Sequence, residues 1–316
     1  MEVNLQDADK KDPSRPFEDA SHLLNDPQAL REKADKSGFL YFKNLLPRNK
    51  VLNLRRDILE IINQQGWLDQ NYPLMDGKVN KEQIDHLSEE ELNWNGVGVP
   101  FEIYHQIQKL ESFHSLAHEP KLVELFKSLF NEEPFIHPRN IGRVMLPNSK
   151  SKKTPSHQDF LHVQGATNTW TCWTPIGDCP KELGGLTILE GSHKAGLLGV
   201  TAKPGAGGLE SILCGLGYEW VAGDYEAGDL VIFHSLTVHK AMPHLVDDQI
   251  RLSCDFRYQP ISQPIEEKSL LPHGPFKWED LYNGWKRDDL KYYWKSNSIE
   301  LTPWDESIRW QKDKIC

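Results

Sequence analysis

The chain has 316 residues, of which 38% are hydrophobic and 10% aromatic, so it can bury a sizeable core and is not expected to be globally disordered. Its formal net charge of −10 argues against nucleic-acid or anionic-membrane partners, because these bind basic surfaces. The five cysteines have irregular spacing and no CxxC pair, which indicates reduced thiols in a cytoplasmic protein rather than disulfides or a thiolate zinc site.

The beginning of the chain is polar and acidic and lacks the apolar stretch of a secretory signal. No run of 18 apolar residues occurs, so no membrane span is expected. Asp26 can cap a helix that begins at Pro27 and ends at Gly38, and "FLYFKNLL" follows as a predicted strand.

The rest of residues 1–134 is predicted to be mostly helical. Apolar residues with helical spacing predict a helix over 51–62. Residues 67–100 are expected to be irregular, with one short helix near 80–92. After residue 100, two helices are expected, with a break between them near Pro120.

Residues 135–260 have a different pattern, in which short strand-like runs such as "NTWTCWTPIGD" and "IRLSCDFRYQP" alternate with Gly, Pro and Asp. This pattern predicts an all-β core, a sandwich or a barrel. Residues 203–217 are rich in Gly but lack the GK[ST] of a phosphate loop, so we expect a flexible loop that could act as a lid. Residues 261–316 are predicted to pack across the outside of the core. We therefore expect residues 1–316 to form a single domain.

A histidine and a carboxylate lie two residues apart in "TPSHQDFLHVQG", at His157 and Asp159. If they lie on a strand, their side chains point to the same side and could share a metal ion. A third ligand must then come from elsewhere, and "GDLVIFHSLTVHKAMPH" offers three histidines whose spacing does not distinguish them, His234, His239 and His244.

Arg251 and Ser253 share one face of the predicted strand "IRLSCDFRYQP" and suit a bound carboxylate. A guanidinium inside a β-barrel requires an anionic partner, since an unpaired buried charge is very costly. Two histidines, one carboxylate and an arginine set back from them favour non-haem Fe(II) with open positions for a chelating co-substrate and dioxygen. Zinc is the alternative metal, but it gives no reason for the arginine and serine.

Four segments together resemble the phytanoyl-CoA dioxygenase-like family of Fe(II)/2-oxoglutarate-dependent oxygenases. They are "HQDF", "TCWTPIGDCPKELGGLTILEGSHK", "GDLVIFHSLTVH" and "RLSCDFRY". The resemblance implies a mainly β fold with flanking helices around a double-stranded β-helix, the cupin-like jelly roll. It also implies Fe(II), with 2-oxoglutarate and O2 as co-substrates, and hydroxylation of an unactivated C–H bond of a small molecule with release of succinate and CO2.

Carried onto this sequence, the resemblance implies roles for the following residues: His157, Asp159 and His239 as iron ligands, Arg251 and Ser253 as the site for the distal carboxylate of 2-oxoglutarate, and Trp173 in the wall of that pocket. The retained Asp159 favours a hydroxylase over a halogenase, because halogenases of this superfamily generally have a small residue there. Arg143 is expected to face the pocket.

Other histidines are not expected to be ligands. His234 and His244 give way to His239, His193 is expected to stabilise its loop, and His162 should point away on a regular strand, at most toward the pocket rim.

The sequence departs from the family where relatives often have a co-substrate lysine, near residues 100–108, and it offers instead Tyr104, His105 and Gln106. Two rival interpretations remain: a cupin-like metal enzyme that does not use 2-oxoglutarate, and a non-catalytic β-sandwich binding module. The Arg251-Ser253 pair counts against the first and the intact triad against the second. Nothing in the sequence indicates an oligomeric state.

Overall fold

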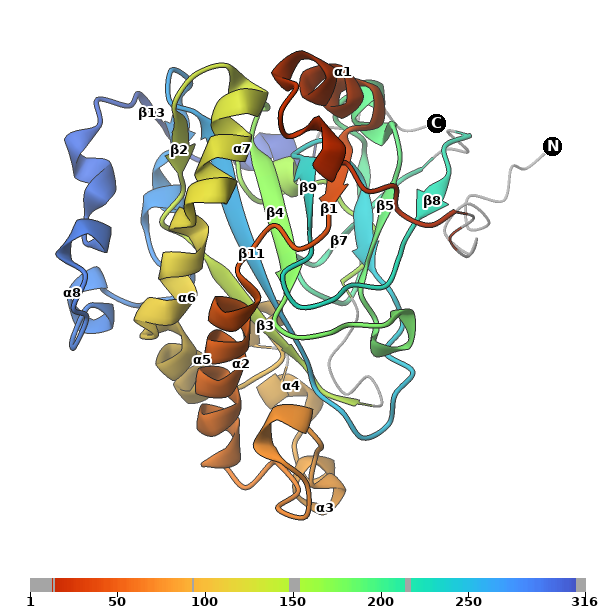
Figure 1. Cartoon of the computed structure of the whole chain (residues 1–316), viewed down its shortest axis with the longest axis vertical. Coiled ribbons are helices and arrows are strands. Elements are labelled where there is room, and N and C mark those ends of the chain that lie inside the picture. The colour runs from red at the N-terminus through yellow and green to blue at the C-terminus, as the bar shows by residue number, and fades with distance from the viewer. Residues whose placement is uncertain (1–12, 14, 93, 148–153, 214–216, 311–316) are drawn as a thin grey trace.

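Two antiparallel sheets form the centre of the computed structural model, which describes residues 13, 15–92, 94–147, 154–213 and 217–310 (Figure 1). The larger sheet has the order β1 (Phe39–Phe42), β9 (Leu230–His234), β4 (Trp170–Pro175), β11 (Arg251–Pro260) and β2 (Pro134–Ile136), and β3 (Ile141–Met145) also pairs with β11. The smaller sheet consists of β10 (His239–Ala241), β5 (Leu186–Leu189) and β8 (Trp220–Val221). Apolar side chains of both sheets, including Trp173, Ile188 and Phe233, pack in one buried cluster, as in a jelly roll.

The side chains of strand β11 point alternately to the two sides of the larger sheet. Its apolar residues Leu252, Cys254, Phe256 and Tyr258 belong to the large hydrophobic core on the helical side. The intervening residues, Arg251, Ser253, Asp255 and Arg257, therefore face the space between the sheets. All four are buried, so β11 places a row of charged and polar side chains in the interior between the sheets.

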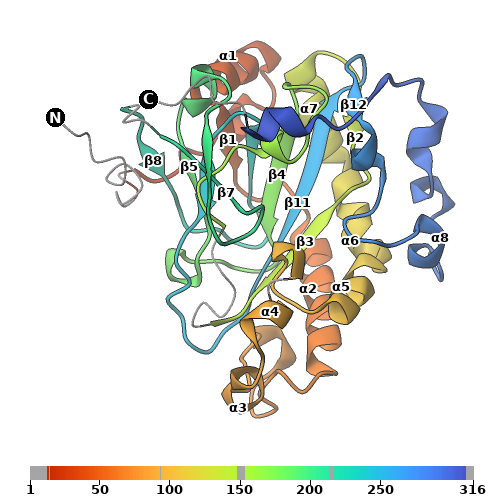
Figure 2. The ribbon, with the colours of Figure 1, turned by 180° about the vertical axis from the view of Figure 1, so that it is seen from behind.

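Helices of the N-terminal half cover the outer side of the larger sheet (Figures 1 and 2). They are α1 (Pro27–Ser37), α2 (Arg48–Asn63), α5 (Phe101–Gln108), α6 (Glu111–Ser115) and α7 (Pro120–Phe130). Their apolar residues share the large core with those of β11. Helix α1 begins and ends as predicted: the Asp26 side chain accepts a hydrogen bond from the Ala29 amide, and Gly38 takes a φ of 75° at the end.

Several predicted boundaries were wrong. Three helices, α5 to α7, replace the two expected over 101–130, and Pro120 begins α7 because the first turn needs no N–H at that position. Two short helices, α3 (Lys81–Asp85) and α4 (Glu89–Leu92), replace the one expected near 80–92. The β core also extends beyond residues 135–260, since β1 from the helical part pairs with β9.

The Gly-rich segment is not simply a loop. Strands β6 (Val200–Ala202) and β7 (Leu209–Ser211) pair as an antiparallel hairpin, and the Ser211 amide donates to the Ser156 carbonyl at 2.7 Å. This contact ties the hairpin to the residue before His157. Residues 214–216, the end of the predicted loop, lie outside the described part of the chain, as do residues 1–12 of the N-terminal segment.

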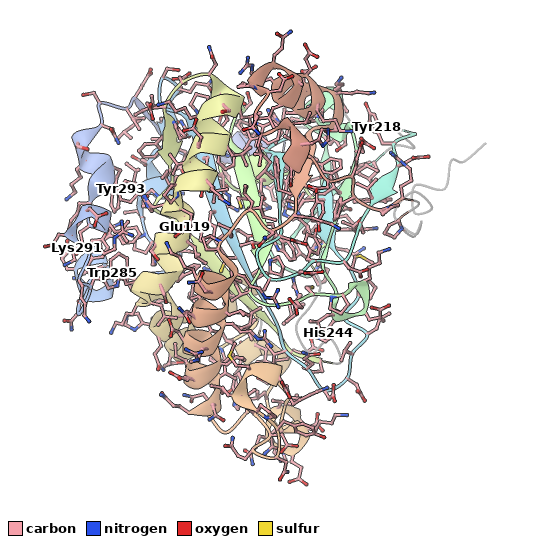
Figure 3. All side chains as sticks on the ribbon, viewed as in Figure 1. Glu119, Tyr218, His244, Trp285, Lys291 and Tyr293 are labelled. Atoms are coloured by element: carbon pink, nitrogen blue, oxygen red, sulfur yellow. The ribbon has the colours of Figure 1, made fainter. Side chains whose placement is uncertain are left out.

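The C-terminal part packs on the outside of the core, on its helical side. It contains α8 (Trp278–Leu281) and the short strands β12 (Ile265–Glu266) and β13 (Leu301–Thr302), which pair in parallel. Trp285 and Tyr293, both labelled in Figure 3, connect this part to the rest of the chain. The indole N–H of Trp285 donates to the Lys109 carbonyl at 2.8 Å, and the Tyr293 hydroxyl donates to the Ile136 carbonyl at 3.0 Å. Among the described residues, no helix combines the length and apolar character of a membrane span.

Candidate metal centre

Two histidines from distant segments are held together by their backbones. The amide of His157 donates to the His239 carbonyl at 3.0 Å, and the amide of His239 donates back at 3.1 Å. This bridge brings the ring centroids within 4.2 Å of each other. The Nδ1 atoms lie 2.8 Å from the Pro155 carbonyl and 3.1 Å from the Thr237 carbonyl, respectively. A carbonyl oxygen accepts only, so each Nδ1 carries a proton, and Nε2 is the ring nitrogen left to bind a metal.

Asp159 faces both of these Nε2 atoms. Its Oδ1 lies 3.5 Å from Nε2 of His157 and 3.7 Å from Nε2 of His239. One ligand atom from each of the three residues fits within a 4.8 Å spread, and all three residues are buried. The expected strand geometry was wrong here, because Asp159 begins a short 3-10 helix, Asp159–Leu161. The side chains converge nevertheless.

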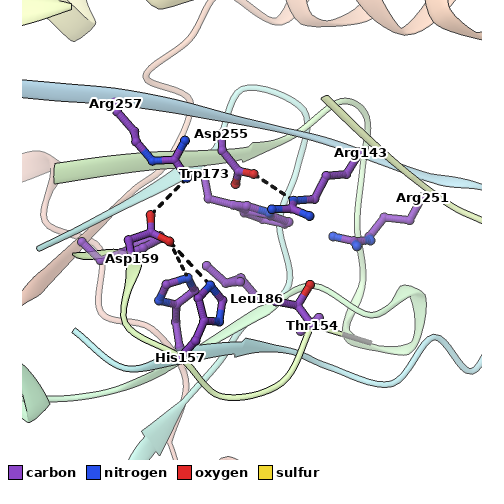
Figure 4. Close-up of a pocket in the computed structure, with 12 residues that line it drawn as sticks. Arg143, Thr154, His157, Asp159, Trp173, Leu186, Arg251, Asp255 and Arg257 are labelled. Atoms are coloured by element: carbon purple, nitrogen blue, oxygen red, sulfur yellow. Dashed lines mark hydrogen bonds and ion pairs between the residues drawn. The ribbon is translucent and has the colours of Figure 1, made fainter. Parts of the chain in front are cut away.

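The second carboxylate oxygen of Asp159, Oδ2, contacts two other side chains. Oδ2 accepts a hydrogen bond from Thr171 Oγ1 at 2.5 Å and lies 3.4 Å from Nη2 of Arg257 (Figure 4). Burial alone would raise the pKa of Asp159, but the neighbouring Arg257 guanidinium opposes this effect, and the pKa lies well below its usual value. The carboxylate is therefore charged, as a metal ligand must be.

Sequence reasoning missed both Thr171 and Arg257. A signal existed for Arg257, since it follows Arg251 by six residues on an alternating strand and so shares its face. Thr171 gave no signal, because its place beside Asp159 comes from the pairing of β4 with β11, in which Thr171 is opposite Arg257.

Arg251 and Ser253 lie farther along the same face of β11. Nη1 of Arg251 is 3.4 Å from Ser253 Oγ, and its guanidinium carbon lies 5.8 Å from the centroid of the Trp173 ring. The Nε atom of Arg251 is buried without a hydrogen-bond partner, and no carboxylate of the described residues is within ion-pair distance. The three residues thus form a cationic recess with unused donors.

One cavity joins this recess to the triad (Figure 4). Twelve residues line it: Arg143, Thr154, His157, Asp159, Trp173, Leu186, Phe233, His239, Ala241, Arg251, Asp255 and Arg257. Arg143 faces the cavity as expected, but it is already engaged. Its Nε donates to Asp255 at 2.9 Å and its Nη1 to the Gly96 carbonyl at 2.9 Å.

The remaining histidines stay outside the metal-binding cluster. His234 Nδ1 accepts from the Leu236 amide at 3.1 Å, and His244, labelled in Figure 3, lies with Nε2 2.9 Å from the Gln249 carbonyl. His193 Nε2 lies 2.9 Å from the carbonyl of Asp35 in α1, which agrees with a loop-stabilising role.

His162 is not in the cluster, but the reason given from the sequence was wrong. The 3-10 helix replaces the regular strand, and the His162 ring centroid lies 5.8 Å from that of His157.

None of the three residues proposed to replace the missing lysine lines the cavity. The Tyr104 hydroxyl lies 2.8 Å from Nδ1 of His273, and His105 stacks on Phe276 with centroids 4.7 Å apart. Gln106 is also absent from the lining of the cavity.

The sequence matches known proteins over most of its length. The profile of the phytanoyl-CoA dioxygenase family matches residues 34–252. Two curated proteins named 1-deoxypentalenic acid 11-beta-hydroxylase are similar to the chain. The one from Streptomyces arenae is 25% identical over 274 residues, and the one from Streptomyces exfoliatus is 24% identical over 270 residues. Each match covers 81% of this chain and 89% of the relative.

Solved structures share the fold. The epimerase SnoN, in complex with Fe3+, alpha ketoglutarate and nogalamycin RO, superimposes with a TM-score of 0.53 at 18% identity, over 76% of this chain and 86% of SnoN. EctD from S. alaskensis with bound Fe gives a TM-score of 0.51 at 16% identity, over 92% of this chain and 93% of EctD. These likenesses support the jelly-roll architecture.

Proposed function

The chain belongs to the phytanoyl-CoA dioxygenase family, and from this premise we propose that it is an Fe(II)- and 2-oxoglutarate-dependent dioxygenase that hydroxylates an unactivated C–H bond of a small molecule. The observation that carries the proposal is the buried cluster of His157, Asp159 and His239 in one cavity with the unpaired Arg251. Residues 1–316 would form a single oxygenase domain. A cytoplasmic location is supported by the free, buried thiols of Cys172, Cys179 and Cys254.

The residues fit an Fe(II) ion. Two imidazoles and one carboxylate bring one ligand atom each within 4.8 Å of one another, and this donor set leaves coordination positions for other ligands. Burial and the neighbouring His157 lower the pKa of His239 to about 3, so its imidazole stays unprotonated at neutral pH. Iron, with 2-oxoglutarate and dioxygen, would supply the oxidising chemistry and yield succinate and CO2.

The chain's own residues would bind 2-oxoglutarate and orient the carboxylate of Asp159. Arg251 would pair with the distal carboxylate of 2-oxoglutarate through its unused donors, with Ser253 Oγ beside it. Trp173 forms the wall next to the guanidinium and excludes water from the pair. Thr171 and Arg257 hold Oδ2 of Asp159, so that Oδ1 stays directed at the histidines.

The proposal is tested by anaerobic titration of the Fe(II)-loaded protein with 2-oxoglutarate, followed by the metal-to-ligand charge-transfer absorption. We expect a saturable band, and a fall in 2-oxoglutarate affinity of about 100-fold in Arg251→Met, because a charged hydrogen-bonded pair is lost. Arg48→Met is the matched control, since Arg48 forms an exposed ion pair with Asp178.

The rival functions predict different results. A cupin-like enzyme that does not use 2-oxoglutarate would bind iron without forming the band. A non-catalytic binding module would bind no iron at this site. Succinate formation in air, with substrate candidates present, would complete the assignment.

A further inference from the structure

We propose that Arg257 binds a carboxylate group of the substrate, so that the enzyme acts on small molecules that carry an acid group near the oxidised carbon. The inference rests on the proposed function, because it assigns the substrate class of the same cavity.

Arg257 is buried with most of its hydrogen-bonding capacity unused. The residue is 5% exposed, and its one side-chain partner in the described structure is Oδ2 of Asp159, at 3.4 Å. Its Nε and Nη1 atoms are buried and lack any partner. Arg143, in the same cavity, differs, because Asp255 and the Gly96 carbonyl engage it at 2.9 Å. A buried guanidinium with two free donors favours a ligand that supplies oxygen atoms.

The position of Arg257 separates it from the co-substrate recess. Arg251 and Arg257 share one face of β11, and the six residue steps from one to the other extend roughly 20 Å along a strand. Figure 4 shows Arg257 above Asp159 and Arg251 at the opposite end of the row. The carboxylate that binds Arg251 therefore cannot also bind Arg257, which lies on the metal side of the cavity.

The charges of the cavity indicate the same ligand. Three guanidinium groups and two carboxylates line it among the described residues, so the protein contributes one net positive charge. Fe(II) and the doubly charged 2-oxoglutarate cancel each other. One positive charge then remains in a buried site, and a substrate carboxylate would neutralise it.

The experiment uses the anaerobic protein loaded with Fe(II) and 2-oxoglutarate, so that Arg251 is occupied and the charge-transfer band reports an intact co-substrate site. Acetate, benzoate and cyclohexanecarboxylate are titrated against their primary amides, with the perturbation of the band as the readout. We expect at least one acid to bind about 10-fold or more tightly than its amide. This preference should disappear in Arg257→Gln, whose amide can still donate to Asp159, and persist in Arg48→Met, which removes a guanidinium from an exposed ion pair outside the cavity.

The other outcomes either overturn the proposal or are decided by a second measurement. Equal binding of every acid and amide, or a preference that survives in Arg257→Gln, excludes Arg257 as the anchor. Weaker 2-oxoglutarate binding in Arg257→Gln with an unchanged acid preference assigns the arginine to the co-substrate instead. If Arg257→Gln loses the band, calorimetry of the acids and amides on metal-free wild type and variant decides the question. Absence of the band in wild type would contradict the proposed function itself.

Discussion

His157 and His239 exchange both backbone hydrogen bonds, at 3.0 and 3.1 Å, although they are 82 positions apart in the chain. The spacing of their imidazoles is thus set by the backbone and does not depend on a metal ion. Asp159 completes the cluster from the turn that follows His157. The site is preorganised, which lowers the cost of binding a metal.

Removal of either imidazole should abolish metal binding without unfolding the protein. His157→Ala and His239→Ala leave the backbone bridge in place, so we expect near-native circular dichroism and Fe(II) or Co(II) affinity reduced by more than about 100-fold. Calorimetric titration with Co(II) measures the loss. His244→Ala is the control and should retain the wild-type affinity. A wild-type affinity in His239→Ala would contradict the assignment of that ligand.

Thr171→Val tests the support behind Asp159. Valine has nearly the same shape but cannot donate to Oδ2, so the carboxylate should rotate more freely and metal affinity should fall about 10-fold. The matched control is Thr187→Val, because the buried Thr187 hydroxyl donates to the Val221 carbonyl at 2.9 Å outside the cavity. That variant should lose about 1 kcal/mol of stability and keep its metal affinity. Equal metal affinities in the two variants would show that Thr171 does not position Asp159.

Stability should fall as the pH drops from about 7 to about 4. Burial lowers the pKa of His114 and of His234 to about 4, and that of His137 to about 3. In the unfolded chain these groups take up protons near pH 6.5, so over this window the unfolded state binds more protons and the free energy of unfolding rises with pH. Each group contributes a slope of up to about 1.4 kcal/mol per pH unit.

Urea denaturation of the metal-free protein at a series of pH values measures this slope. His137→Asn should have a shallower slope than wild type, because one of the contributing imidazoles is gone. Identical slopes in the two proteins would exclude His137 as a contributor.

Gly98→Ala should destabilise the wall of the cavity. Gly98 has a φ of +84°, and a Cβ there would lie 1.7 Å from the Val144 carbonyl oxygen in β3, the strand that carries Arg143. Gly66→Ala is a matched control, since Gly66 has a φ of +75° with nothing within 4 Å of the added Cβ. We expect Gly66→Ala to cost about 1 kcal/mol and Gly98→Ala clearly more, as measured by urea denaturation.

Local rules determined much of this protein from the sequence alone. The Asp26 cap, Pro27 and Gly38 define helix α1 through contacts within a few residues. Alternation along "IRLSCDFRYQP" places Arg251 and Ser253 on one face for the same local reason, and the His157–Asp159 pair and the Arg251–Ser253 pair indicated iron and a carboxylate co-substrate. The four segments in order carried the resemblance to the family that matches residues 34–252.

Tertiary structure decided what spacing alone left open. Among His234, His239 and His244, only His239 pairs with the backbone of His157, so the bridge between distant segments brings it to Asp159. The contacts of Thr171 and Arg257 with Asp159 depend on the register of β4 against β11, and the turn at Asp159 replaces a predicted strand. Propensity and alternation act over a few residues, whereas these placements come from cross-strand hydrogen bonds and packing between segments far apart in the chain.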